Sequence, residues 1–176
     1  SDKEEYAART IRPKVRAHLE RFLVALEETH PRRDSLETVL PGGVDVGDVD
    51  GVLARLRVPA GAGRVTSMRG GASEARRLLR AFTARKLPRY ADDRSDPGGD
   101  VLSHLSPYLH VGQISPLEVA LAVADADGAS KEARGAFLEE LVVRRELSMN
   151  FCATNDAYDS YDCLPAWARR TLGRHA

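Results

Sequence analysis

The sequence predicts an all-α protein. Apolar residues recur at steps of three and four along most of the chain, which is the spacing of an amphipathic helix, and alternating runs of β-branched residues are scarce. Capping signals such as Ser106-Pro107 and Ser115-Pro116-Leu117-Glu118 mark the starts of predicted helices. With 176 residues, the chain has the size of one domain with a real core.

The first part of the chain is predicted to hold two helices, at about 4–9 and 13–28. The second helix has an apolar stripe and ends before Pro31; the stripe is Val15, Leu19, Phe22, Leu23 and Leu26.

From about 30 to 70 the helical pattern weakens and loops are expected. Pro41-Gly42-Gly43 indicates a turn, 46–56 a short helix and 59–63 a loop. We expect 1–70 to be a helical linker region that leads into a helical domain at 71–176.

Helices dominate the predicted domain. Ser73 is expected to cap a helix that reaches about Leu87, with Leu78, Leu79 and Phe82 turned inward. The Pro and paired Gly of 95–100 indicate a loop.

Four further elements follow that loop. A short helix starts with Ser106 as its cap and stops at Gly112, and the capping box at Ser115 starts the next. Ser130 caps a longer helix to about 151, and a loop at 152–165 precedes a last helix at 165–172.

The net charge does not indicate a nucleic-acid partner, because 26 basic residues balance 26 acidic ones. The stretch 64–94 nevertheless holds nine basic residues against three acidic ones. Such a run is either a solvated helix face or a surface that faces phosphates.

Cys152 and Cys163 show no spacing typical of zinc or of a disulfide framework, so we expect a reduced, intracellular (cytoplasmic) protein without metal. Its short apolar runs and charged start predict no membrane span and no signal peptide. The polar, helix-like start at Ser1 also suggests an excised fragment or a processed start.

Ser103 and Ser106 place two hydroxyls three residues apart at a predicted helix start. Unpartnered backbone N–H groups there bind anions, so the pair is either a cradle for nucleotide phosphates or plain helix capping. His104 and His110 flank the same helix, and each is either a ligand contact or structural.

Apolar side chains cover nearly all of the surface of the predicted helix 130–151. When its residues are projected at 100° per residue, the charged Glu140 and Arg144 fall among these apolar positions. Turned inward, the two charges would border a common cavity with Ser103 and Ser106 and mark a site; turned outward, they are an ordinary intrahelical pair.

Tyr90 and Arg94 stand one turn apart at the end of the basic stretch. In one interpretation, Tyr90 contacts the ring of a ligand and Arg94 its phosphate. In the other, Tyr90 packs in the core and Arg94 faces solvent. The sequence contains no GxGxxG, GxxxxGK or HExxH pattern, which disfavours common dehydrogenases, kinases and hydrolases.

Taken together, these stretches resemble class II cyclobutane-pyrimidine-dimer photolyases of the photolyase/cryptochrome family. The resemblance follows the order and spacing of EYAARTIRPK (5–14), KLPRYA (86–91), RSDP (94–97), LSHLSPYLHVGQISP (102–116), FLEELVVRRELSMNFC (137–152) and LPAWA (164–168). It is weakest between 29 and 70.

The resemblance implies that 71–176 is the first half of a helical domain that binds FAD and DNA. It implies FAD contacts at Tyr90, Leu102, Ser103, His104, Leu105, Ser106, Leu109 and Arg144. Arg94 would lie toward the DNA backbone, and Glu140 would contact the pyrimidine dimer with Arg144 nearby. Val143 stands where other classes carry an aromatic residue, which puts stacking on the lesion from that position in doubt.

The implied activity is that of a carbon–carbon lyase, the light-dependent repair of dimers in ultraviolet-damaged DNA by electron transfer from reduced FAD. The family also has an α/β domain upstream and further helices downstream, so this chain is expected to be truncated and to need the missing remainder. The alternatives are a non-catalytic, cryptochrome-like or truncated interaction module, and a generic helical DNA-binding module.

Overall fold

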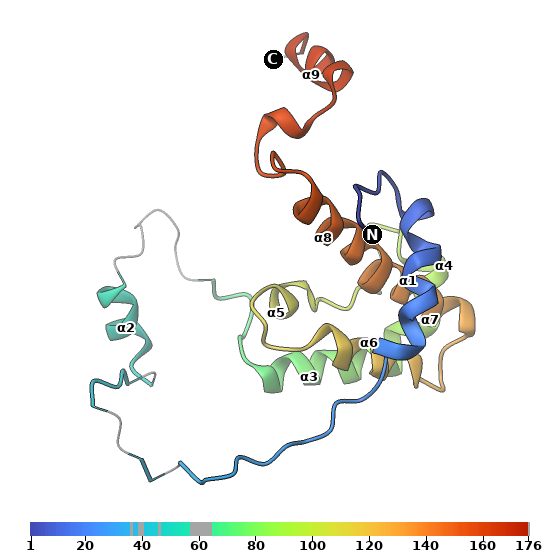
Figure 1. Cartoon of the computed structure of the whole chain (residues 1–176). Coiled ribbons are helices and arrows are strands. Elements are labelled where there is room, and N and C mark those ends of the chain that lie inside the picture. Colours follow the sequence, from blue (N-terminus) through green and yellow to red (C-terminus); the bar gives the residue numbers. More distant parts are fainter. Residues whose placement is uncertain (36, 39–40, 46, 57–64, 176) are drawn as a thin grey trace. The chain divides into compact units, whose positions relative to one another are not determined.

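The computed structural model describes residues 1–35, 37–38, 41–45, 47–56 and 65–175. Within these ranges the regular elements are all helices, which confirms the all-α prediction (Figure 1). The chain forms two compact units, one of Ser1–Ala25 with Gly70–Ala176 and one of Leu26–Arg69. The functional division at residue 70 stays a prediction, although residues 1–25 group with the segment that follows it.

The smaller unit contains α2 (Val49–Arg55), in agreement with the short helix expected there. Its Pro41–Gly42 turn is also confirmed, whereas the loop predicted at 59–63 lies outside the described residues.

The larger unit carries the remaining elements. They are α1 (Ala8–Phe22), α3 (Ala72–Ala81), the π-helix η1 (Phe82–Lys86), the 3₁₀ turn η2 (Leu87–Arg89), α4 (Tyr90–Asp93), α5 (Ser106–His110), α6 (Pro116–Ala124), α7 (Lys131–Leu138), the π-helix η3 (Glu139–Arg144), α8 (Arg145–Thr154), the 3₁₀ turn η4 (Tyr161–Cys163) and α9 (Ala166–Gly173). Loops therefore occupy less of 152–165 than predicted.

Helix α1 corrects the prediction of two N-terminal helices. It is one helix with Pro13 inside it, which costs the hydrogen bond that residue 13 would donate to the Arg9 carbonyl. Its buried face is Ala8 and Ile11, packed with Val143. The predicted stripe is wrong at its far end, because Phe22 and Leu26 are exposed.

The helical run from 72 to 93 begins and ends elsewhere than predicted. Gly71, with φ of 111°, precedes it in place of Ser73, and the Gly71 N–H donates to Gln113 Oε1 at 2.9 Å. The run continues past Leu87 because Pro88 lies in a 3₁₀ turn at a position that needs no intrahelical N–H donor.

The caps of the later helices follow the sequence more closely. Ser115 and Ser130 accept hydrogen bonds from Leu117 N and Ala133 N, although Glu118 accepts from Arg76 of α3 instead of completing a capping box. Gly112 ends α5 with φ of 72°, and Gln113 N donates to Tyr108 O at 2.8 Å, as in a Schellman motif. Leu105, one residue before the predicted Ser106, is the cap of α5.

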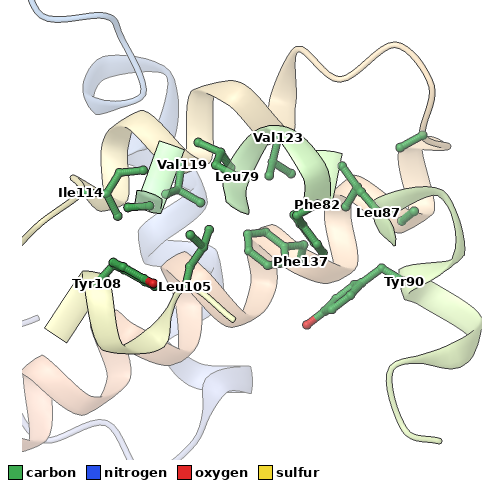
Figure 2. Packing of buried hydrophobic residues seen from close by; sticks show 13 residues of the cluster. Leu79, Phe82, Leu87, Tyr90, Leu105, Tyr108, Ile114, Val119, Val123 and Phe137 are labelled. Carbon is green, nitrogen blue, oxygen red and sulfur yellow. The ribbon is translucent and has the colours of Figure 1, made fainter. Parts of the chain in front are cut away.

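The core of the larger unit is built around three aromatic rings, Phe82, Tyr90 and Phe137 (Figure 2). The centroids of Phe82 and Phe137 lie 4.7 Å apart, and Tyr90 meets Phe137 edge to face at 5.3 Å. The inward positions predicted from the sequence are confirmed, since Leu79 and Phe82 are buried and Leu78 packs against them.

We expect Phe82→Ala to destabilise the chain by about 3–5 kcal/mol, because it leaves a cavity beside two rings. Phe22→Ala is the matched control: the same change at a side chain that is 62% exposed, against 1% for Phe82, should cost less than about 1 kcal/mol. Urea unfolding of both variants measures the difference. Equal losses would contradict the core described here.

Glu5 ties the N-terminal residues to α1 and α8. Its buried carboxylate accepts hydrogen bonds from Lys14 and from the Ser1 hydroxyl, while its backbone N–H donates to Asn150 Oδ1 at 2.7 Å. The hydrogen bond from Lys14, and then that from Ser1, lowers the pKa of Glu5 to about 2.

Because folding lowers the pKa of Glu5, its carboxylate stabilises the folded chain at pH values above the unfolded pKa of about 4.5. This contribution is lost as the pH falls toward 2. Glu5→Gln should therefore lower stability at pH 7, and the gap to the unmodified chain should close between about pH 4.5 and 2. Denaturant titrations across this range test it, with exposed Glu20→Gln as the control. A gap independent of pH would refute the assigned role of Glu5.

Candidate functional site

Three of the predicted site residues meet at the edge of the aromatic core. The Arg94 guanidinium carbon lies 6.0 Å from the centroid of the Tyr90 ring, and Arg94 Nη1 lies 3.5 Å from Glu140 Oε1. Arg94 Nη1 also lies 3.5 Å from the Ala136 carbonyl oxygen. The end of α4 is thus joined to α7 and η3, and two charged side chains stand beside one phenol.

Exposure separates the members of this cluster. Tyr90 is only 7% exposed as a residue, whereas the side chains of Arg94 and Glu140 are 38% and 45% exposed. Burial raises the pKa of the Tyr90 hydroxyl, against the opposing effect of Arg94. Arg94 and Glu140 can therefore reach a ligand with their charged groups, whereas only a small part of Tyr90 is accessible to one.

The inward orientation predicted for Glu140 and Arg144 is wrong in this structure, because both residues are exposed. The π-helix η3, whose hydrogen bonds run from i to i+5, turns each residue by a smaller angle than an α-helix, so the 100° projection loses phase toward Arg144 at its end. Glu140 lies only one residue beyond the start of η3 and contacts Arg94 of another element. Val143 is the buried residue of η3 and packs against Ala8 and Ile11 of α1.

The predicted phosphate cradle lies in the segment Asp100–Ser106, which we call the serine loop. Ser103 Oγ accepts a hydrogen bond from Leu105 N at 3.3 Å, which leaves its hydroxyl proton able to bind an oxygen of a ligand. Leu105 is fully buried; its backbone N–H donates to Ser103 Oγ, and its carbonyl oxygen accepts from Leu109 N at 2.9 Å. Leu102 is exposed, and Leu109 packs partly against the core.

A charged cluster surrounds the serine loop. Asp100 Oδ1 accepts a hydrogen bond from Lys86 Nζ at 2.6 Å and lies 3.0 Å from His104 Nε2. Lys86 Nζ also donates to the Leu102 carbonyl oxygen at 3.2 Å. Lys86, and after it His104, lowers the pKa of Asp100. His104 has φ of 55°, a left-handed conformation that costs a non-glycine residue about 1–2 kcal/mol.

The basic stretch 64–94 is largely compensated within the structure. Ion pairs with carboxylates hold Arg76, Arg77, Lys86, Arg89 and Arg94. Most of these pairs lie on exposed helix surface, which favours a solvated face for much of the stretch. Arg64 lies outside the described residues.

A groove of about 1110 Å³ lies away from these residues, between α1 and the α8 side of η3. Its walls include Ile11, Leu19 and Val142, and none of the predicted site residues lines it. The common cavity expected for the two serines, Glu140 and Arg144 is therefore not this groove.

Among the described residues, no three His, Cys, Asp or Glu side chains gather as metal ligands. None of the helices in the described part of the chain is long and apolar enough to span a membrane.

Lys86 and Asp100 belong to the site although sequence reasoning did not select them. They stand 14 residues apart, on a π-helix and in a loop, so no periodic pattern relates them. The only available signals were the lysine within the basic stretch and the aspartate directly before the serine run.

No protein-family model matches the chain. Several curated relatives match nearly its whole length, and each of these carries the name deoxyribodipyrimidine photolyase. The relative from Methanothermobacter thermautotrophicus is 45% identical over 175 residues, which are 99% of this chain and 37% of that protein.

The relatives from Potorous tridactylus and Arabidopsis thaliana are 36% and 34% identical and match all of this chain. These matches cover 32% and 36% of the two proteins, so the chain spans about a third of the length of the relatives it matches. From end to end, the chain is similar to a segment of proteins that carry the name deoxyribodipyrimidine photolyase.

Proposed function

We propose that this chain is the first half of the helical FAD- and DNA-binding domain of a class II photolyase, whose full-length form repairs cyclobutane pyrimidine dimers in light. The proposal is carried by the end-to-end similarity to photolyases, which includes 45% identity over 175 residues. The contact between Arg94 and Glu140 agrees with it, because it joins two side chains for which the resemblance implies DNA and dimer contacts.

The serine loop fits the diphosphate of FAD. Ser103 keeps its hydroxyl proton free to donate because its oxygen accepts from Leu105 N, and Ser106 is an exposed hydroxyl at the first turn of α5. Lys86 and His104 add positive or polar groups beside the loop. From the resemblance we assign Leu102, Leu105, Leu109, Tyr90 and Arg144 to the rest of the FAD contacts.

FAD supplies the electron-transfer chemistry, and this chain orients the partners. Arg94 binds a DNA phosphate, for which a guanidinium is well suited, and the dimer leaves the duplex to reach the flavin. Glu140 contacts the dimer through its half-exposed carboxyl group; in its protonated, hydrogen-bonding form it donates to the dimer and steadies the negative charge that develops there. Such a protein acts inside the cell, on DNA.

Glu140→Gln or Glu140→Ala, in a full-length chain that carries this segment, should lower the repair yield while flavin stays bound, because the contact to the dimer is weakened. We expect a loss of about tenfold or more, typical of removing one electrostatic contact to a reacting group. Counting dimers repaired per absorbed photon measures it. Exposed Glu132→Gln at the start of α7 is the control; unchanged repair in both Glu140 variants would refute the role.

Arg94→Ala in the same full-length chain should weaken binding to DNA of any sequence and lower the slope of log affinity against log salt by about 1, since one phosphate contact is lost. Binding to damaged duplexes at several salt concentrations provides the slope. Arg89→Ala, which removes an arginine paired with Asp93 on the same helical run, should leave it unchanged. Identical slopes for Arg94→Ala and the parent would argue against a phosphate contact.

A further inference from the structure

Two buried side chains anchor the serine loop. Val101 is 1% exposed near its beginning, and Leu105 is fully buried near its end, within the core that holds Phe137. Ser103 and His104 lie between these anchors, and Ser106 follows directly after Leu105. Their arrangement therefore depends on contacts of the loop itself, since the core fixes only its ends.

One carboxylate oxygen makes the principal side-chain contacts across the loop. Asp100 Oδ1 meets both Lys86 Nζ at 2.6 Å and His104 Nε2 at 3.0 Å, and Lys86 Nζ reaches on to the Leu102 carbonyl at 3.2 Å. Lys86 belongs to η1, so its side chain ties the loop to the helical run of the core. His104 is held in a left-handed backbone conformation, which an L residue adopts only when its surroundings impose it.

We propose that Asp100 is a positioning residue that, by bridging Lys86 and His104, holds the serine loop in the shape that receives the FAD diphosphate. The inference rests on the proposed FAD site and adds to it a residue that need not touch the cofactor. Asp100 also keeps the Lys86 ammonium beside the loop, and Lys86 in turn offsets a carboxylate charge that would otherwise repel a diphosphate.

The exposure of the bridge distinguishes this role from a contribution to folding. The Asp100 side chain is 74% exposed, and ion pairs in such positions contribute little to the stability of the whole chain. Removing the carboxylate charge should therefore leave unfolding almost unchanged and act on the loop alone. A flavin without a diphosphate should not sense the change.

The proposal is tested by measuring how tightly full-length chains with Asp100→Asn bind FAD and riboflavin. Riboflavin serves as the comparison because it has no diphosphate. We expect FAD to bind about tenfold more weakly, as after the loss of one well-placed charged hydrogen bond, with riboflavin affinity and the unfolding midpoint of the flavin-free chain unchanged. Exposed Asp127→Asn is the matched control and should bind FAD as the parent does. Unchanged FAD affinity, or an equal loss for both flavins, would overturn the role of Asp100.

Ser103→Ala and Ser106→Ala separate this inference from the proposed function. If the serine variants weaken FAD binding and Asp100→Asn does not, the FAD site stands and the bridge falls. If neither serine variant affects FAD binding, the diphosphate site is wrong and the inference about Asp100 falls with it.

Discussion

The packing of the Tyr90 ring against Phe82 and Phe137 is the contact on which the candidate site depends (Figure 2). Tyr90 opens α4 and Phe137 lies in the last turn of α7, so burying these rings together fixes α4 against α7. Arg94 follows Tyr90 by one turn, and Glu140 follows Phe137 by three residues. Their contact is therefore a consequence of aromatic packing, and its exposed position at the rim leaves both charges available to a ligand.

In the π-helix η3, the neighbouring residues Glu139 and Glu140 contact different arginines. Glu139 accepts a two-pronged set of hydrogen bonds from Arg12 of α1, at 2.7 and 3.0 Å, while Glu140 meets Arg94 at the end of α4. The same segment turns Val143 toward Ala8 and Ile11. One irregular stretch of helix thus joins α1 to the core and presents Glu140 at the rim, in keeping with the frequent occurrence of π segments at functional sites.

Local patterns sufficed to predict the helical class, the caps at Ser115 and Ser130, and the stop at Gly112, because each is determined by a few adjacent residues. They failed for Glu140 and Arg144, which the projection turned inward and which are exposed; the π-helical pitch of residues 139–144 shifts the phase of Arg144, at its end, far more than that of Glu140. Pro13 likewise suggested a break that the structure does not have, and the long helix expected to 28 ends at Phe22. The bridge from Lys86 through Asp100 to His104 depends on a left-handed residue and on partners far apart in sequence, which no periodicity reveals.

Similarity to photolyases extends over the whole chain, whereas the activity of the full-length protein is a proposal that one measurement can decide. Ultraviolet-irradiated DNA is incubated with the full-length protein and reduced flavin, in near-ultraviolet or blue light and in the dark, and the remaining cyclobutane dimers are counted. We predict that dimers disappear in the light and persist in the dark. Dimers that persist in the light, with flavin demonstrably bound, would contradict a repair function and leave a flavoprotein of another kind.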